Sequence, residues 1–157
     1  MFSILGNRLP DSRVLDLFAG TGAIGIEALS RGATHVTAVE SQAESLKLLR
    51  HNIAECGMNS LVSVQARTVK QFLARPDLWT GPYDIVIADP PYDMAYKLED
   101  MFETVPAALA SPDAWLVVEH ASKTILPDRL GVTTLKKRYQ YGDTALSIFS
   151  FPCEAVA

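Results

Sequence analysis

The stretch Asp16-Leu17-Phe18-Ala19-Gly20-Thr21-Gly22-Ala23-Ile24-Gly25 decides the fold. The apolar pair Val14-Leu15 precedes it, and a helical pattern continues from it to Leu29. A buried strand that turns through glycines into a helix is a common cradle for nucleotide-like ligands. Glycine lets the backbone approach the ligand, and the first helical N–H groups are free to donate hydrogen bonds. The glycine spacing also fits the dinucleotide fingerprint. The stretch therefore predicts a cofactor pocket but does not name the cofactor.

Strand and helix patterns alternate along the chain after this stretch. We expect strands near 13–17, 35–40, 61–65, 83–88 and 114–119, and helices near 23–31, 42–56, 67–74 and 97–110. Such alternation predicts a parallel sheet covered by helices on both faces. Two further strands, 133–139 and 144–151, are joined by a turn at Gly142-Asp143 and give the sheet an antiparallel end. The sequence thus predicts one α/β domain over residues 1–157, with a mostly parallel seven-stranded sheet.

The helix expected at 42–56 has the clearest local signals. Ser41 and Glu44 have the spacing of a capping box, and Gly57 stands where a helix ends. Leu46, Leu49 and Ile53 form its apolar stripe.

Size and composition exclude several classes of protein. The chain has 157 residues, of which 48% are hydrophobic and 20% charged, as in one globular domain. No apolar run approaches the ~20 residues of a membrane helix, and the start Met1–Leu5 lacks the features of a signal peptide. Cys56 and Cys153 form no CxxC pattern, which argues against a zinc site or a disulfide framework. We therefore expect a cytoplasmic protein without a metal.

Three acids are expected along one edge of the sheet. Asp16 ends the first strand, Glu40 the second and Asp89 the fourth. Ligands of open α/β sheets bind at the carboxyl ends of the strands, near the point where the strand order reverses. Carboxylates crowded there repel a pyrophosphate dianion but attract a sulfonium and an α-ammonium group. The sequence therefore favours S-adenosylmethionine (SAM) over a dinucleotide.

Two of these acids have specific expected contacts. Glu40 lies 20 positions after Gly20, where an acid accepts hydrogen bonds from the 2′ and 3′ hydroxyls of a ribose. The alternative for Glu40 is a solvated acid at a strand end. Asp16 is expected to contact the amino-acid part of SAM, directly or through water. The alternative for Asp16 is a carboxylate that only caps the glycine turn.

The tetrapeptide Asp89-Pro90-Pro91-Tyr92 directly follows the buried run Tyr83–Ala88. Its two prolines stiffen the loop and remove two N–H donors, so that the backbone presents carbonyl groups. The exocyclic amine of a nucleobase is a weak nucleophile, because its lone pair is delocalised into the ring. Hydrogen bonds from the amine to the Asp89 carboxylate and the Pro90 carbonyl would localise that lone pair, while Tyr92 would stack on the base. The alternative is a rigid loop with an aromatic plug. We predict that these four residues form the catalytic set of an amino-methyltransferase.

These motifs resemble those of the bacterial small-subunit ribosomal RNA guanine-N2 methyltransferases. The resemblance runs from Phe2 to Thr144 and is carried by Asp16–Gly22, Gly25–Ala33, Asp89–Tyr92, Val117–His120 and Tyr141–Thr144. The run Ser30–Ala33 is more specific than the tetrapeptide, which adenine-N6 methyltransferases share. The resemblance implies a Rossmann-like class I methyltransferase fold with an antiparallel last strand, and a guanine of 16S ribosomal RNA as the substrate.

Motif and resemblance together give a cofactor-binding set, which is Asp16, Phe18, Ala19, Gly20, Thr21, Gly22, Glu40, Ser41, Arg67 and Thr68. Two departures from the family pattern stand out. The family usually has an acid after the third strand that contacts the adenine amino group, and Thr68 stands at that place here. A hydroxyl accepts that hydrogen bond weakly, which predicts lower adenine selectivity or SAM affinity. The family also carries a basic N-terminal arm before the region that matches Phe2. This chain begins without it, which fits a net charge of −4 in an RNA enzyme.

The run Lys136-Lys137-Arg138-Tyr139-Gln140-Tyr141 interleaves cations with aromatic rings. This pattern is typical of an edge that faces RNA. The alternative is an edge strand whose cations prevent aggregation, and the sequence leaves both open.

The expected reaction is one in-line transfer of a methyl group from SAM to guanine N2, without a metal or a covalent intermediate. We expect a monomer that acts on 16S ribosomal RNA or the 30S subunit and has no membrane partner. Two alternatives keep the chemistry but change the acceptor to adenine N6 or a protein glutamine amide. A third is a SAM-binding domain that is inactive without an RNA-binding arm.

Overall fold

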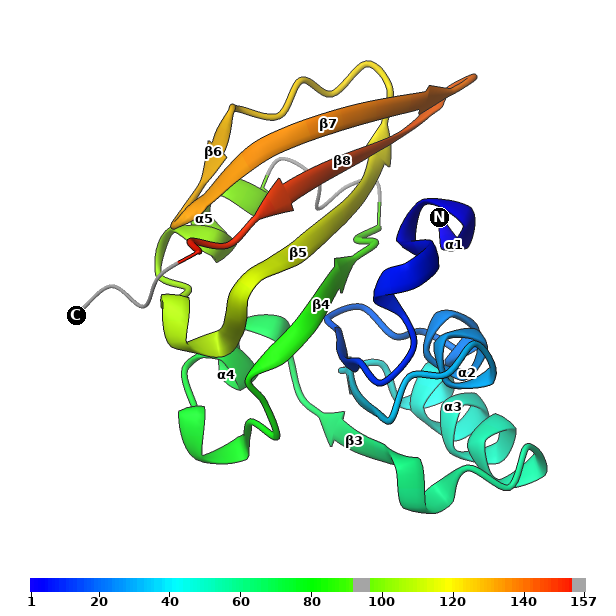
Figure 1. Cartoon of the computed structure of the whole chain (residues 1–157). Helices are drawn as coiled ribbons and strands as arrows, with labels where there is room; N and C mark the ends of the chain where they lie inside the picture. The colour runs from blue at the N-terminus through cyan, green and yellow to red at the C-terminus, as the bar shows by residue number, and fades with distance from the viewer. Residues whose placement is uncertain (92–96, 154–157) are drawn as a thin grey trace.

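A computed structural model describes residues 1–91 and 97–153 of the chain (Figure 1). Its centre is one eight-stranded sheet with the order β3-β2-β1-β4-β5-β8-β7-β6. The strands are β1 Arg13–Asp16, β2 His35–Glu40, β3 Val62–Ala66, β4 Tyr83–Ala88, β5 Ala110–Ala121, β6 Arg129–Leu130, β7 Thr133–Tyr141 and β8 Thr144–Ser150. The helices are α1 Phe2–Leu5, α2 Ala23–Ser30, α3 Ala43–Glu55, α4 Val69–Leu73 and α5 Leu98–Glu103.

The strands β1 to β5 pair in parallel, and β8 pairs antiparallel with both β5 and β7. The order reverses at β1, which lies between β2 and β4. This confirms the predicted Rossmann-like α/β fold with an antiparallel last strand. The sheet has eight strands rather than the expected seven, because the two-residue β6 pairs with the start of β7. A strand of two residues is too short to give a sequence pattern.

Two hydrophobic clusters hold the helices against opposite faces of the sheet. One cluster contains Leu5, Ala28 and Leu49, and therefore lies under α1, α2 and α3. The other contains Phe72 and Phe102, and lies under α4 and α5. We call the first of these faces the α2 face. Helices thus cover both faces, as the strand–helix alternation predicts.

One predicted helix cap and one predicted helix boundary are wrong. The capping box of Ser41 and Glu44 does not form, because α3 begins at Ala43 after an N-cap, Gln42, that makes no side-chain cap. Instead, the Gln42 N–H donates to Glu40 Oε2 at 2.8 Å. The helix expected at 97–110 ends at Glu103, since Pro106 cannot continue it, and a 3-10 turn and the start of β5 occupy the remainder.

A capping box does form at the start of α4, where Thr68 and Gln71 exchange side-chain and backbone hydrogen bonds. Among the described residues, no helix has the length and apolar character to cross a bilayer.

Candidate cofactor and catalytic site

Three predicted acids lie at the carboxyl ends of neighbouring strands. Asp16 and Glu40 are the last residues of β1 and β2, and Asp89 directly follows β4. Side chains alternate between the faces of a sheet, and Val14, Ala38 and Ile87 belong to the cluster on the α2 face. Asp16, Glu40 and Asp89 each stand two residues further along, so all three continue the α2 face. The strand order β2-β1-β4 therefore brings these acids together, as predicted.

Hydrogen bonds connect the glycine loop to Glu40 and to the preceding residue of β2. The Gly20 N–H donates to Glu40 Oε1 at 2.8 Å, and the Ala19 N–H donates to the Val39 carbonyl at 3.0 Å. Because a carboxylate has about four lone-pair sites, Glu40 retains acceptor capacity beyond its bonds to Gly20 and Gln42. This arrangement places the predicted ribose acceptor directly beside the predicted cofactor loop.

The glycines of the loop have different structural roles. Gly20 has φ +56°, and a Cβ added there would meet no atom within 4 Å, so its backbone faces open space. Gly22 has φ +89°, and an added Cβ would lie 2.5 Å from Leu49 Cδ1. Gly25 lets α2 approach β2, because a Cβ there would lie 2.9 Å from Val36 Cγ1. Gly20 is therefore free for a ligand, whereas Gly22 and Gly25 serve close packing.

We expect Gly22→Ala to lower the free energy of unfolding by about 2–4 kcal/mol, because the methyl group combines left-handed strain with a steric clash. Gly57→Ala is the matched control, since Gly57 has φ +66° with open space around its Cα, and should cost about 1–2 kcal/mol. Urea unfolding measures both. Equal losses for the two variants would contradict the packing role of Gly22.

Asp16 has an unsatisfied buried oxygen. The side chain is 1% exposed, and its Oδ1 accepts from the Phe18 N–H at 3.3 Å. Its Oδ2 is buried and has no hydrogen-bond partner in the described part of the chain. The pKa of Asp16 is raised to about 7, mainly by burial, with smaller contributions from the negative charges of Asp89 and Glu40, while the hydrogen bond from Phe18 opposes the shift. A buried acceptor is costly without a donor, so this oxygen is a place for a cationic donor.

Arg67 carries the other unsatisfied buried side-chain atom found in residues 1–91 and 97–153, its Nε. The neighbouring Thr68 is the N-cap of α4, and its hydroxyl accepts from the Gln71 N–H at 3.1 Å. The Thr68 hydroxyl is therefore already engaged within the chain. Both unsatisfied atoms belong to the predicted cofactor-binding set.

The predicted catalytic tetrapeptide begins where β4 ends. Asp89 is half-buried, Pro90 is buried and Pro91 is exposed, while Tyr92 lies outside the described residues. Burial raises the pKa of Asp89 to about 6, with a second contribution from the negative charge of Glu119. Asp89 is thus a carboxyl group with a weakened preference for the ionised form.

Glu119 is a site residue that the sequence analysis missed. Register pairs Ile87 with Val117 and Ala88 with Val118, so the next residues, Asp89 and Glu119, stand side by side. Val117 packs on the α2 face, and Glu119 continues that face. Glu119 is half-exposed, and its carboxylate makes no hydrogen bond or ion pair with the described residues. The sequence signal was present, because an acid ends the apolar run of β5 just as Asp89 ends that of β4.

The acids form a row rather than a chelating cluster. Among the described residues, no three His, Cys, Asp or Glu side chains are grouped so that they could hold a metal ion.

The remaining predicted residues lie around the loop. Ala19 is buried, and Phe18 is half-buried against the cluster under α4 and α5. Thr21 and Ser41 are exposed, and the Thr21 carbonyl accepts from Asn52 Nδ2 at 2.9 Å.

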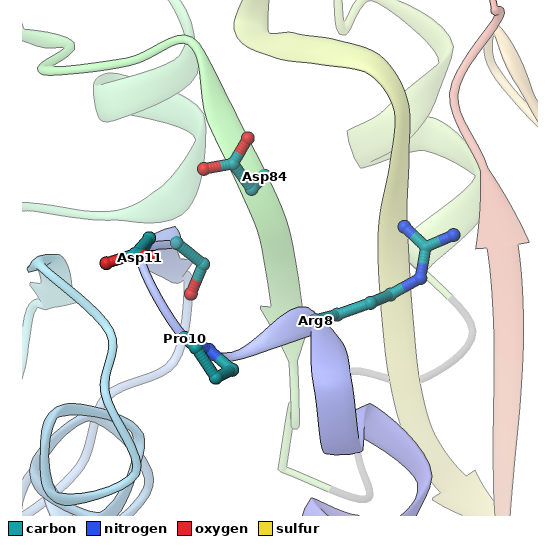
Figure 2. A pocket seen from close by; sticks show the side chains of 5 residues that line it. Arg8, Pro10, Asp11 and Asp84 are labelled. Atoms are coloured by element: carbon teal, nitrogen blue, oxygen red, sulfur yellow. The ribbon is translucent and has the colours of Figure 1, made fainter.

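A separate hollow of about 310 Å³ lies at the opposite, amino end of the strands and is lined by Arg8, Pro10, Asp11, Ser12 and Asp84 (Figure 2). Several of its polar groups have partners within the chain. Asp84 accepts from the Arg13 N–H at 2.8 Å and from Ser111 Oγ at 3.0 Å, and the Arg8 guanidinium stacks 4.0 Å above Trp115. This hollow is therefore a polar feature of the strand starts, separate from the row of acids at the carboxyl ends.

A known protein family covers nearly the whole chain. The model of a family described as Conserved hypothetical protein 95 matches residues 1–150. The chain belongs to this family. A relative named Ribosomal RNA small subunit methyltransferase D, from Escherichia coli strain K12, is 35% identical over 149 residues, which are 95% of this chain and 73% of that protein. The resemblance found in the sequence is thereby confirmed at the level of the family.

A solved structure of a conserved hypothetical protein from Streptococcus pyogenes matches this Conserved hypothetical protein 95 member with a TM-score of 0.80. It is 26% identical and covers 96% of this chain and 92% of that one. A more distant relative, the tRNA1(Val) (adenine(37)-N6)-methyltransferase of Shewanella sp. strain W3-18-1, is 29% identical over 51% of this chain and 33% of that protein. The sequence similarity therefore extends to proteins named for different acceptors.

Proposed function

We propose that this chain transfers a methyl group from SAM to the exocyclic N2 amine of a guanine in 16S ribosomal RNA. Methylation of small-subunit ribosomal RNA is the activity in the name of its Escherichia coli relative; the guanine, its N2 atom and the 16S RNA are the finer part of the proposal. The observation that carries it is the buried Oδ2 of Asp16, which has no hydrogen-bond partner among residues 1–91 and 97–153 and lies beside the open Gly20 backbone, in the same row as Asp89. We further propose a cytoplasmic monomer that acts on this RNA or on the 30S subunit.

The polar atoms of the site fit SAM. Asp16 Oδ2 is an acceptor for the α-ammonium group, Glu40 retains acceptor capacity for ribose hydroxyls, and the unsatisfied Arg67 Nε–H is a donor for an adenine ring nitrogen. Thr68 contributes little to the binding of SAM in this assignment, because its hydroxyl already accepts a hydrogen bond from the backbone. SAM supplies an electrophilic methyl group on a cationic sulfur, and the surrounding acids stabilise that positive charge.

The chain's own residues position the acceptor amine. Asp89 and the Pro90 carbonyl accept hydrogen bonds from the two N–H groups of the amine and localise its lone pair toward the methyl group. From the sequence, Tyr92 stacks on the base. After transfer, the proton that the nitrogen loses passes to the Asp89 carboxylate, whose raised pKa of about 6 makes it a better proton acceptor than an ordinary aspartate.

Glu119 favours guanine over adenine as the acceptor. Guanine carries an N1–H donor next to its N2 amine, whereas adenine carries a lone pair at N1 next to its N6 amine. A free carboxylate beside Asp89 accepts a hydrogen bond from the guanine N1–H and repels the adenine N1 lone pair. This observation supports guanine N2 over the adenine-N6 alternative.

Product analysis tests the function. Small-subunit ribosomal RNA and 30S subunits from cells that lack the modification are incubated with the protein and tritiated SAM, and the nucleosides are separated after digestion. We expect labelled N2-methylguanosine at one position. Labelled N6-methyladenosine would favour the adenine alternative, and SAM binding without transfer to either substrate would favour an inactive SAM-binding domain.

We expect Glu119→Gln to lower kcat/KM for the guanine substrate by about 10–100-fold, mainly through KM, because the N1–H loses a charge-assisted hydrogen bond. The assay uses ribosomal RNA ligated to carry guanine or 2-aminopurine at the mapped position, since 2-aminopurine has the N2 amine but no N1–H. Wild-type protein should prefer guanine, and Glu119→Gln should lose most of that preference. Glu55→Gln, an exposed residue of α3, is the control. If Glu119→Gln still preferred guanine over 2-aminopurine as the wild type does, Glu119 would not be the acceptor for the guanine N1–H.

A further inference from the structure

Three side chains of β7 form a stripe on the α2 face. Lys137, Tyr139 and Tyr141 pair with Ile148, Leu146 and Thr144 of β8, and directly paired residues of antiparallel strands share a face. Ile148 and Leu146 belong to the cluster on the α2 face, so the stripe faces the same side of the sheet as Asp89 and Glu119. We call Lys137, Tyr139 and Tyr141 the β7 stripe.

The β7 stripe is level with the proposed active site. Glu119 pairs with Leu146, and Leu146 pairs with Tyr139, which places Tyr139 two strand spacings, or roughly 10 Å, from Glu119. Tyr141 is level with Ala121 and so lies further toward the carboxyl end of β5. Figure 1 shows the β7–β8 hairpin extending past this end of β5. The stripe thus lies two strands beyond Glu119, with β8 between them.

The cations of β7 are exposed and not neutralised by acids. Lys136, Lys137 and Arg138 are all exposed, and the ion pairs found in the described part of the chain, Arg31–Glu27 and Arg75–Asp77, lie elsewhere. The Lys137 ammonium stands 4.8 Å from the centre of the Tyr139 ring, and Tyr141 is 55% exposed. Exposed cations beside an exposed ring match the chemistry of an RNA strand, which offers phosphates and stacking bases.

In the described part of the chain, no strand pairs with the outer edge of β7 along this segment, although Arg138 donates to the Ser122 carbonyl of the β5–β6 connection at 2.6 Å. β6 pairs only with Thr133 and Thr134, so the backbone from Lys136 to Tyr141 has β8 as its described strand neighbour on one side only. A nucleic-acid strand can therefore approach the stripe from the α2 face.

We propose that the β7 stripe, together with Lys136, binds the single-stranded RNA that flanks the target nucleotide. The lysines contact phosphates, and Tyr141 stacks on a neighbouring base. The row of acids repels phosphates, so the two surfaces together orient the RNA with its backbone on β7 and its base beside Asp89. The identity of the RNA as ribosomal rests on the proposed function. Because the chain has an overall charge of −4, which repels RNA phosphates, RNA binding requires a local positive surface.

Replacing the β7 lysines by glutamate distinguishes a role in RNA binding from a role in preventing aggregation at the sheet edge. Glutamate protects an exposed edge as lysine does but repels phosphate. We expect the double variant Lys136→Glu, Lys137→Glu to remain monodisperse in size-exclusion chromatography, to keep the wild-type Kd for SAM, and to bind 16S ribosomal RNA at least tenfold more weakly in filter binding. The slope of log K against log salt should become shallower by about 1.4, at roughly 0.7 for each phosphate that the lysines no longer neutralise. Tyr141→Ala should weaken RNA binding about tenfold with an unchanged salt slope.

Lys47→Glu with Arg50→Glu is the matched control, because both residues belong to α3, away from β7, and the change in net charge is the same. We expect a much smaller loss of RNA affinity in this control. Equal losses in the two double variants, or wild-type affinity and slope in the β7 variant, would overturn the proposal. These binding measurements need no methyl transfer. If the β7 variant loses RNA affinity but the wild-type protein forms no N2-methylguanosine, the proposed function alone is refuted. If the wild-type protein methylates guanine and the β7 variant has the same KM for RNA, the RNA-binding role of the β7 stripe alone is refuted.

Discussion

Asp89→Ala should abolish methyl transfer while leaving SAM binding intact. We expect kcat to fall by about 10³-fold, because the acceptor amine loses the carboxylate that localises its lone pair in the transition state. The Kd for SAM, measured by calorimetry, should change by less than about threefold, since Asp16, Glu40 and the glycine loop remain. Asp77→Ala, at an exposed acid paired with Arg75, is the control for general effects of removing a carboxylate.

The pH profile gives a second readout of the same residue. Burial and Glu119 raise the pKa of Asp89 to about 6, and the ionised form is the acceptor. At saturating SAM, the wild-type kcat/KM for the RNA should therefore rise as the pH increases through about 6. Asp89→Asn should retain weak activity without that rise. Turnover at the wild-type rate in Asp89→Ala would show that the Asp89 carboxylate does not activate the acceptor amine.

Asp16→Asn should stabilise the protein without ligand and weaken SAM binding. The folded-state pKa of Asp16, about 7, lies above its ordinary value of 3.8. The stability that the neutral carboxyl contributes is therefore fully present below about 3.8 and is lost as the pH rises through about 7. Asparagine stays neutral at all these pH values. At pH 8, we expect the variant to gain about 2–4 kcal/mol in the free energy of unfolding, and to gain little at pH 4.

The same substitution removes the charge that SAM requires. We expect its Kd for SAM at pH 8 to be about 10–100-fold higher than in the wild type, since a charge-assisted hydrogen bond becomes a neutral one. The wild-type Kd should increase as the pH falls below about 7, and the Kd of the variant should not. Asp77→Asn should change neither property. Wild-type SAM affinity in Asp16→Asn would show that this buried oxygen does not hold the cofactor.

The parts of the site that follow from strand order were predictable from sequence. Each of Asp16, Glu40 and Asp89 ends an apolar run, and parallel strands bring such ends to one edge. Alternation of strands and helices implies parallel pairing, so the row of acids required no knowledge of side-chain packing. Gly20 follows the same logic, because the turn from β1 into α2 needs a residue with positive φ.

The parts that depend on competition between hydrogen bonds were not predictable. Ser41 and Glu44 have the spacing of a capping box, but the Glu40 carboxylate takes the Gln42 N–H and the helix begins later. For Thr68, the sequence analysis predicted a contact between its hydroxyl and the cofactor, whereas in the structure this hydroxyl caps α4. Glu119 ends the apolar run of β5 and could have been assigned to the same edge, but its place directly beside Asp89 depends on the register of β4 with β5, which a sequence pattern does not specify.

The most direct test of the account is a crystal structure of the protein with S-adenosylmethionine bound. We predict the α-ammonium group within hydrogen-bond distance of Asp16 Oδ2, the ribose hydroxyls at Glu40, and the methyl group directed toward Asp89. A cofactor seated at the amino ends of the strands, near Arg8 and Asp84, or one that leaves Asp16 Oδ2 without a donor, would contradict it.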